Sequence, residues 1–367
     1  DCLVVKEVTK NSNKAASSYQ DVFNTFGYDY RFTTRQAPTN DEKKKAFVIN
    51  DTNFIKEGFC GFHFGAYRLP YDKLKDRQLT FEEISNTSSG DPKLALLKLD
   101  VDNLGNLFLR GLGEKSTVSR VTSLSRMFAL YFEGYINHLI AKKNWNDHLY
   151  VVFSGGDDTF IVGAWDKVFD FTQEFYKDFR NFTCHHPLVT FSAGICVFRY
   201  DYPIVMSSRM TEVALDKAKV YVEPGKVIPS KDKVSIFGEV FNWAEYSCIR
   251  DFKDLLLSIM ENNKNKEGFG RTFLYRIWKS TLGFKRILQD SLQGRVDNIR
   301  FWRLAYYLRD VARKDAEKLI GKYREIVINN VLEKGEGEKI SNIMVVPVAV
   351  KWAQMETRKV RGREDDR

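Results

Sequence analysis

Two adjacent glycines between two short apolar runs constrain the fold of this chain more than any other feature. The runs Leu149–Phe153 and Phe160–Gly163 are rich in aromatic and β-branched residues, which is typical of β-strands. Gly155 and Gly156 stand between them, and a glycine pair between two such runs favours a tight turn. The sequence therefore predicts a β-hairpin at this point.

Paired acids lie at the tip of this hairpin and at the end of a second predicted strand. Asp157 and Asp158 follow the glycines, and two carboxylates on an uncovered turn repel each other unless a cation lies between them. The apolar run Lys93–Val101 predicts a strand that ends in Asp100 and Asp102, which strand alternation places on one face. A hard divalent cation such as Mg²⁺ or Mn²⁺ suits these carboxylate oxygens.

Two acidic strand ends in one chain favour a site for phosphoryl transfer. Enzymes of this kind use metal ions to bridge nucleotide phosphates and to stabilise the attacking and leaving oxygens. We expect Asp100, Asp157 and Asp158 to be the metal ligands and the catalytic residues, with Asp102 as a weaker metal candidate because it can instead cap the turn. The alternative is that both motifs are ordinary turns at strand ends.

The elements around these acids occur in the order expected of an α+β domain. A first strand is followed by a turn, a long helix and the hairpin, and then by a helix, a strand, a second helix and a final strand. This order fits a ferredoxin-like palm of the cyclase and polymerase type, a split βαβ sheet with an added helix and strand. The predicted ranges are 103–113 for the turn, 118–143, 165–182 and 207–221 for the helices, and 188–198 and 234–237 for the later strands.

The character of the sequence changes after the last of these strands. Amphipathic patterns predict five helices with short connections, which indicates an all-α helical bundle. The chain is therefore divided into residues 1–60, the tail of a preceding domain or a linker, residues 61–240, the palm, and residues 241–367, the helical domain. A strand is predicted at Phe47–Ile49, and a short helix with Thr80 as its N-cap is predicted before the first palm strand. The five helices are predicted at 243–260, 272–288, 299–313, 316–332 and 342–357.

The distribution of charged residues and of cysteines indicates which partners and which cellular compartment suit the chain. Residues 241–367 hold 26 Lys and Arg against 18 Asp and Glu, whereas residues 1–240 hold 31 against 30. The excess of basic residues fits either solvated helix faces or contact with RNA phosphates and RNA-bearing partners. The five cysteines are dispersed without a Cys-x-x-Cys pair, as expected in a reducing cytoplasm. No apolar run reaches the length of a membrane span, so no membrane contact is expected.

The motifs of the palm segment resemble a known family. The segment from Gly61 to Phe237 is similar to the palm shared by nucleotide polymerases, GGDEF diguanylate cyclases and the large subunit of type III CRISPR effector complexes. The Ser-Gly-Gly-Asp-Asp form favours the CRISPR subunit, and is closest to the III-A (Csm-type) subunit, because the cyclases usually carry Glu-Phe after Gly-Gly-Asp. The matching segments are 100–105, 123–126, 154–158, 162–166, 192–195 and 217–219.

This resemblance implies a nucleotidyltransferase that makes cyclic oligoadenylates from ATP in an RNA-guided antiviral complex. It implies that Lys219 contacts phosphate and that Ser154 lies near adenine, while Gly155 and Gly156 let the backbone approach a phosphate. The implied partners are the other subunits of the complex, with guide RNA and target RNA. Two alternatives stay open: a scaffold that binds metal and nucleotide without turnover, and a GGDEF-like cyclic dinucleotide synthase that uses GTP.

The resemblance also implies parts that this sequence does not show. Family members commonly carry an N-terminal HD nuclease and a first palm, and no His-Asp dipeptide occurs in this chain. The chain begins with Asp1 rather than Met, so we expect a fragment that binds ATP and synthesises little when isolated. DNA cleavage is not expected of it.

Overall fold

The computed structural model describes most of the chain and divides it into two compact units. The first unit comprises Asp1–Tyr67, Ser116–Leu139 and Ser154–Gly156. The second comprises Arg68–Lys115, Ile140–Phe153 and Asp157–Arg367. The predicted palm strands and C-terminal helices fall almost entirely in the second unit. The described residues are 2–7, 24, 28–33, 44–49, 59–63, 65, 69–72, 74–223, 228–265, 270–286, 304, 306–309, 311, 313–332 and 342–358.

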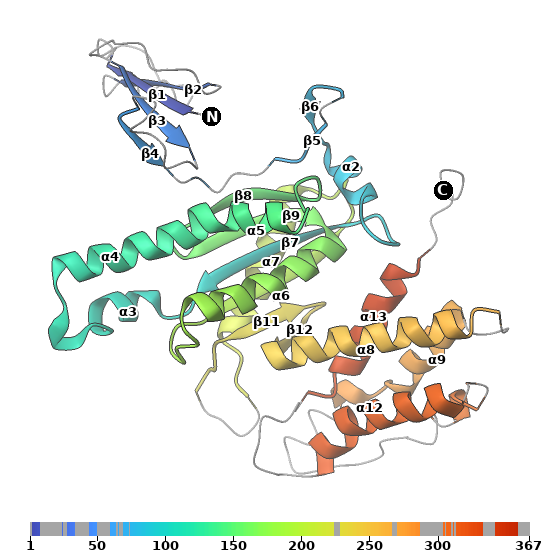
Figure 1. The fold of residues 1–367 in the computed structure, drawn as a ribbon. Helices are drawn as coiled ribbons and strands as arrows, with labels where there is room; N and C mark the ends of the chain where they lie inside the picture. The colour runs from blue at the N-terminus through green and yellow to red at the C-terminus, as the bar shows by residue number, and fades with distance from the viewer. Residues whose placement is uncertain are drawn as a thin grey trace. The chain divides into compact units, whose positions relative to one another are not determined.

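A six-stranded sheet forms the centre of the second unit (Figure 1). Its strand order is β12-β11-β10-β7-β9-β8, in which β7 pairs antiparallel with β9 and β10, and β10 pairs parallel with β11. Along the chain the main elements run β7, the helices α4 (Val118–Ala129) and α5 (Ile136–Lys142), β8, β9, α6 (Trp165–Phe182) and β10, which is the predicted β-α-β-β-α-β order. The strands are β7 Leu94–Val101, β8 Leu149–Gly155, β9 Asp158–Ala164, β10 Phe191–Phe198, β11 Lys233–Ile236 and β12 Glu239–Asn242.

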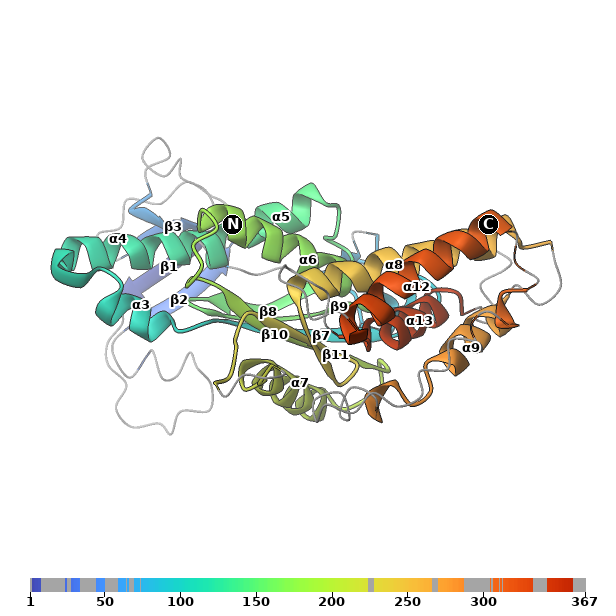
Figure 2. The same ribbon diagram turned by 90° about the horizontal axis from the view of Figure 1, so that it is seen from below.

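Helices cover both faces of this sheet, α6 (Trp165–Phe182) on one and α7 (Ile204–Lys219) on the other (Figure 2). The bounds of α6 confirm the prediction. Helix α7 lies directly on β10, since a Cβ atom at Gly194 would come within 2.3 Å of the backbone nitrogen of Leu215. The side chains of α6 that the apolar pattern marked are all fully buried: Trp165, Val168, Phe169, Phe171, Phe175 and Phe179.

The C-terminal helices pack against α6 and against one another. The ring of Trp352 on α13 meets the ring of Phe169 on α6 edge to face, with 4.7 Å between the centroids. The hydroxyl of Tyr246 on α8 donates a hydrogen bond of 3.1 Å to the carbonyl of Phe169. The prediction over 299–313 lies mostly outside the described residues. The helix predicted over 272–288 was too long, since α9 ends at Ser280 and a turn follows at 281–283, while 287–288 lie outside the described residues. The described helices are α8 Trp243–Asn262, α9 Arg271–Ser280, α12 Arg313–Leu332 and α13 Val345–Glu356.

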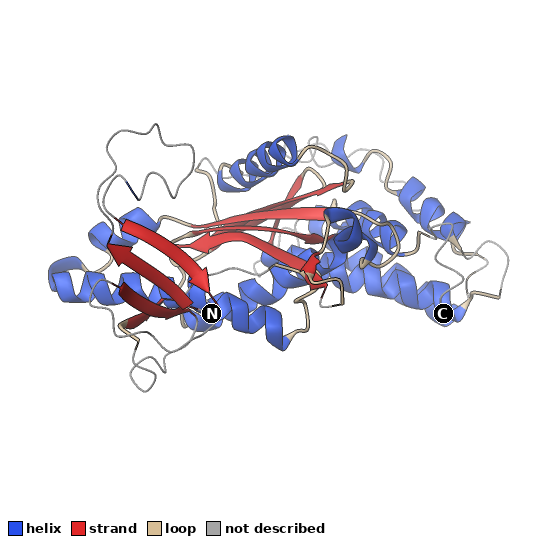
Figure 3. Cartoon of the chain, turned by 90° about the horizontal axis from the view of Figure 1, so that it is seen from above, coloured by secondary structure: helices blue, strands red, loops and turns tan. Residues whose placement is uncertain are grey.

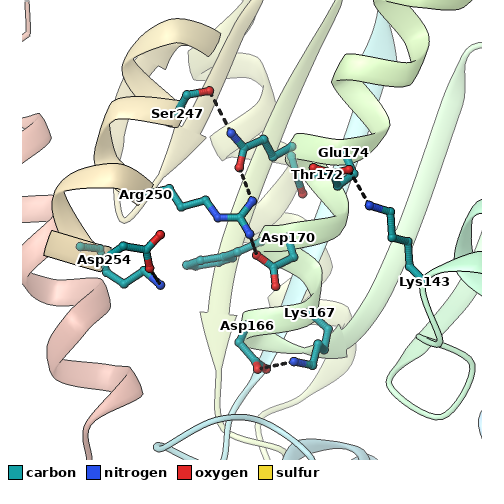
Figure 4. A network of polar contacts seen from close by, with 12 residues as sticks. Lys143, Asp166, Lys167, Asp170, Thr172, Glu174, Ser247, Arg250 and Asp254 are labelled. Atoms are coloured by element: carbon teal, nitrogen blue, oxygen red, sulfur yellow. Dashed lines mark hydrogen bonds and ion pairs between the residues drawn. The ribbon is translucent and has the colours of Figure 1, made fainter. Parts of the chain in front are cut away.

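A polar network also joins α6 to α8 (Figure 4). The guanidinium of Arg250 on α8 lies 3.1 Å from a carboxylate oxygen of Asp170 and donates a hydrogen bond of 2.6 Å to Gln173 Oε1, both on α6. The Nε2 atom of Gln173 in turn donates to Ser247 Oγ at 2.9 Å. Directional contacts of this kind fix the rotation of one helix against the other, which apolar packing alone does not.

Two segments differ from the sequence prediction. The helix predicted over 118–143 forms three consecutive pieces, because six residues in its middle adopt π-helical hydrogen bonding: α4 Val118–Ala129, a π-helix Leu130–Tyr135 and α5 Ile136–Lys142. The turn predicted over 103–113 was wrong, since this stretch contains helix α3, Leu104–Arg110. The left-handed backbone of Asn103, with φ of 58°, turns the chain after β7, and the Leu107 N–H then bonds the Asn103 carbonyl at 3.0 Å.

A four-stranded sheet with the order β2-β1-β3-β4 lies in the first unit, where Figure 3 shows its strands in red. The strand predicted at Phe47–Ile49 is confirmed as part of β3, whereas the other three were not predicted. These strands are β1 Cys2–Glu7, β2 Tyr28–Thr33, β3 Lys44–Ile49 and β4 Gly61–His63.

Three short elements precede β7 in the second unit. Strands β5 (Tyr71–Asp72) and β6 (Arg77–Gln78) pair with each other, and helix α2 (Phe81–Asn86) follows. The side chain of Thr80 caps α2 as predicted, in a capping box with Glu83. None of the helices in the described ranges combines the length and the apolar character that a membrane crossing requires.

Candidate active site

The ends of β7 and β9 bring two of the predicted acids together. Asp100 and Asp158 are direct partners in the antiparallel register of these strands. The N–H group of Val101 donates a hydrogen bond of 3.2 Å to the carbonyl of Asp157, so the pairing continues into the hairpin turn. Cross-strand partners lie within about 5.5 Å at their Cα atoms, so the carboxylates of Asp100 and Asp158 share one location.

A lysine of the same chain, Lys219, forms an ion pair with Asp100 at this point. Lys219 is the last residue of α7, and its Nζ atom lies 2.8 Å from Oδ2 of Asp100. The side chains of Lys219 and Asp100 are 25% and 21% exposed, so the ion pair is partly shielded from water. The helix that carries Lys219 is fixed by its close approach to β10 at Gly194.

The negative charge of the acids outweighs the positive charge of Lys219 in this group, and the pKa values shift accordingly. Burial, followed by the hydrogen bond to Asp100 and the charges of Asp100 and Asp157, raises the pKa of Asp158 to about 6. Lys219 opposes this rise through its positive charge. Burial alone would lower the pKa of Lys219, but its hydrogen bond to Asp100 and the nearby negative charges raise it above its ordinary value. The negative charges that act on the Lys219 ammonium are those of Asp100, Asp158 and Asp216.

Asp102 occupies a different environment from the other acids. Its carboxylate is buried and accepts three hydrogen bonds, from the hydroxyls of Thr190 and Ser192, each at 2.8 Å, and from the backbone N–H of Asp232 at 3.0 Å. Burial raises the pKa of Asp102, while these three donors act to lower it. All three donors lie outside the turn that follows β7, so these hydrogen bonds join Asp102 to the start of β10 and to the segment before β11.

Sequence reasoning missed the polar residues behind this turn. Asp232 receives a hydrogen bond of 3.0 Å from the hydroxyl of Tyr176 on α6, and Lys231 donates one of 2.9 Å to the side chain of Asn103. Together with Asp102 they tie the segment before β11 to the end of β7. No motif marks these residues, because their spacing along the chain reflects strand pairing rather than a local pattern.

The remaining predicted residues belong to the first unit. Gly156 has φ of +63°, a left-handed conformation that favours glycine and forms the hairpin turn. A Cβ atom on Gly155 would lie 3.3 Å from Oε1 of Glu133, so the Glu133 side chain would have to shift by a few tenths of an ångström to admit it. The hydroxyl of Ser154 is buried and donates a hydrogen bond of 2.7 Å to the carbonyl of Phe132, within the π-helix.

The acid pair fits a divalent cation that also binds substrate. In the described part of the chain, no three His, Cys, Asp or Glu side chains are arranged as a complete metal site. Mg²⁺, however, is commonly held by one or two carboxylates, with waters and substrate phosphates completing its octahedral shell. The Asp100 and Asp158 carboxylates, whose mutual repulsion a dication would relieve, supply that number of ligands.

Comparison with known proteins places the palm segment in a defined family. Residues 93–226 match the family Cas10/Cmr2, second palm domain. A Methanocaldococcus jannaschii protein, the CRISPR system single-strand-specific deoxyribonuclease Cas10/Csm1 (subtype III-A), is 31% identical over 277 residues, which are 67% of this chain and 35% of that protein. The protein of the same description from Mycobacterium tuberculosis is 31% identical over 248 residues, 63% of this chain and 28% of that protein.

Solved structures share the fold over nearly the whole chain. A Csm1–Csm4 cassette in complex with one ATP superposes with a TM-score of 0.66 at 21% identity, covering 97% of this chain and 48% of that chain. A cassette in complex with cA4 gives a TM-score of 0.64 at 22% identity, covering 96% and 48%. At this identity the likeness establishes the fold.

The relatives are considerably longer than this sequence. The chain spans about a third of the length of the curated relatives, 35% and 28% for the two named above, and about half of the chains in the solved structures. The match nevertheless covers the strands, the hairpin and the helix that carry the acids and Lys219. The chain is therefore a homologue of the type III-A Cas10/Csm1 proteins, of which it carries the second palm domain.

Proposed function

We propose that this chain is the part of a metal-dependent nucleotidyltransferase that makes cyclic oligoadenylates from ATP within an RNA-guided type III CRISPR effector complex. The observation that carries the proposal is the pairing of Asp100 with Asp158 across β7 and β9, with Lys219 at 2.8 Å from Asp100. Two carboxylates beside a cationic side chain are suited to a metal-bound triphosphate. Fold relatives in complex with ATP, AMPPNP and cA4 support the choice of ligand.

The acids are assigned to the divalent metal, Mg²⁺ or Mn²⁺. Asp100, Asp157 and Asp158 would hold it, and Asp102 is the weaker candidate because its oxygens already accept three hydrogen bonds from the protein. When bound, the metal would lower the pKa of the attacking hydroxyl and stabilise charge on the leaving oxygen. The reaction joins a 3′-hydroxyl oxygen to an α-phosphorus, breaks the bond from that phosphorus to the bridging oxygen and releases pyrophosphate.

The other predicted residues are assigned to the nucleotide. Lys219 would neutralise phosphate charge, and the lack of side chains at Gly155 and Gly156 would let a phosphate approach the backbone. The resemblance implies that Ser154 lies near the adenine, and this likeness is the ground on which ATP is proposed over GTP. In this chain the hydroxyl of Ser154 donates to the Phe132 carbonyl.

Partners are proposed from the charge of the chain and from its relatives. The excess of basic residues after residue 240 suits contact with guide RNA, target RNA or the subunits that hold them. The relatives include a Csm1–Csm4 subcomplex of the type III-A CRISPR-Csm interference complex. We propose that the parent protein of this chain assembles with subunits of the same kind.

Product analysis tests the proposal. Labelled ATP or GTP is incubated with Mg²⁺ or Mn²⁺, target RNA and the assembled complex, with either the native chain or an Asp157→Ala, Asp158→Ala variant. The expected result is cyclic oligoadenylate from ATP with the native chain and none with the variant. An Asp201→Ala variant is the matched control, since Asp201 is exposed and forms a surface ion pair with Arg199.

The same experiment separates the two alternatives. A cyclic product from GTP would indicate the dinucleotide synthase, and nucleotide binding without any product would indicate the scaffold. Undiminished oligoadenylate from the double variant would contradict the assignment of the hairpin acids.

A further inference from the structure

The chain supplies its own cation to the acid at which the metal is proposed to bind. The Nζ atom of Lys219 is 2.8 Å from Oδ2 of Asp100, a distance typical of a charge-assisted hydrogen bond. We infer that Lys219 is a built-in counter-ion that competes with the divalent metal at Asp100 and transfers to the substrate phosphates when the metal–nucleotide complex binds. This inference rests on the proposed function and adds an order of events to it.

The packing of α7 fixes the backbone of Lys219 and leaves its ammonium group free to move. Ala218, the preceding residue, is fully buried, and α7 lies on β10 where Gly194 permits the approach. The Lys219 side chain itself is 25% exposed and consists of a flexible four-carbon stem. The ammonium can therefore exchange Asp100 for another anion within its reach without any movement of the helix.

Charge repulsion prevents the Lys219 ammonium and a divalent cation from binding the Asp100 carboxylate at the same time. Asp100, Asp157 and Asp158 form an anionic group that Lys219 partly neutralises in the chain as it stands. A divalent cation at Asp100 would repel an ammonium bonded to the same carboxylate, because like charges a few ångströms apart disfavour each other strongly in a partly shielded site. A triphosphate that arrives with the metal offers the displaced ammonium a replacement partner.

Competition predicts opposite effects on two ligands when Lys219 is removed. Without the ammonium, the metal alone no longer displaces a counter-ion, so its affinity rises. The nucleotide loses a phosphate contact, so its affinity falls. A lysine that only contacted phosphate would leave the affinity for the metal alone unchanged.

The experiment measures both affinities on the 367-residue chain. Free Mn²⁺ is followed by electron paramagnetic resonance without nucleotide, and ATP binding is followed by calorimetry at saturating Mn²⁺. For Lys219→Met we expect Mn²⁺ to bind about tenfold tighter and ATP about tenfold weaker, each equivalent to about 1.4 kcal/mol. The matched control is Lys217→Met on the same helix end, where the ammonium is exposed and bonds the Gly238 carbonyl, and both affinities should stay within about twofold of native.

A conservative variant and a double variant make each outcome decisive. Lys219→Arg keeps a cation at the helix end, so its Mn²⁺ affinity should stay near native, which a purely steric effect of the methionine would not produce. Unchanged or weaker Mn²⁺ binding by Lys219→Met, with a native chain that does bind Mn²⁺ and ATP, overturns the inference and leaves the proposed function standing. A native chain that binds Mn²⁺ no better than an Asp100→Asn, Asp158→Asn variant overturns both.

Discussion

The ionised carboxylate of Asp158 should destabilise the metal-free fold, and Asp158→Asn should remove that effect. Burial, followed by the hydrogen bond to Asp100 and the charges of Asp100 and Asp157, raises the pKa of Asp158 from 3.8 to about 6. A rise of this size corresponds to about 3 kcal/mol if it is fully expressed in the free energy of unfolding. Because Asp158 is an exposed residue, solvent screening reduces the expected effect to about 1 kcal/mol.

The direction of the pH dependence follows from the order in which the two states lose the proton. The folded pKa lies above the unfolded one, so between pH 3.8 and about 6 the folded state binds more protons than the unfolded state. The free energy of unfolding of the native chain therefore falls as the pH rises through this window, and the full loss persists above it. Asparagine carries no charge, so the advantage of Asp158→Asn should grow through the window and then stay constant.

Urea unfolding followed by tryptophan fluorescence gives the measurement, in EDTA and at a series of pH values from about 4 to 8. The six tryptophans of the chain provide the signal. Asp201→Asn is the control, because Asp201 belongs to an exposed ion pair with Arg199, and its effect should stay within about 0.5 kcal/mol at every pH. A gain for Asp158→Asn that is absent at pH 8, or equal at all pH values, would refute the reasoning.

Two further predictions concern packing. Trp352→Ala should lower the free energy of unfolding of the second unit by about 3 kcal/mol, because it removes a buried ring whose centroid lies 4.7 Å from that of Phe169. An unfolding midpoint equal to native would contradict this. Gly194→Ala should lower the same free energy of unfolding by about 2 kcal/mol, because the added Cβ would meet the Leu215 backbone nitrogen at 2.3 Å and push α7 off β10. The exposed Gly321→Ala within α12, where an added Cβ meets open space, should not lower it, and equal unfolding midpoints for the two variants would argue against the close approach.

The sequence predicted best where a local pattern coincides with the fold. The Gly155-Gly156 pair and its flanking apolar runs define the hairpin, and the periodic aromatic residues of α6 define a helix whose predicted bounds the structure confirms. In both cases burial repeats with the period of the element, so a short window holds the information. The polar N-terminal stretch lacks such a period, and only part of β3 was predicted there.

The site was predictable in its residues and not in its contacts. The strand ends at Asp100 and Asp158 can be read from composition, but their direct pairing depends on the register of β7 with β9. The ion pair of Lys219 with Asp100 depends on how α7 crosses the sheet, which no local pattern encodes. The hydrogen bond from the Asp232 N–H to Asp102 likewise joins segments 130 positions apart, and no local pattern marked the π-helical stretch Leu130–Tyr135.

The hydrogen bonds that join the C-terminal end of α13 to Asp91, just before β7, have a consequence for synthesis on the ribosome. The Asp91 N–H donates a hydrogen bond of 2.9 Å to the Met355 carbonyl, and the Asp91 carboxylate accepts one of 2.9 Å from Arg358, across 267 positions of chain. The strand that carries Asp100 is therefore held at its beginning by residues translated long after it. Translation adds about 5–20 residues per second, so at least several seconds pass between the synthesis of α6 and that of Trp352. During this time the aromatic face of α6 lacks the ring that covers it, and the nascent palm presents apolar surface that a chaperone can bind.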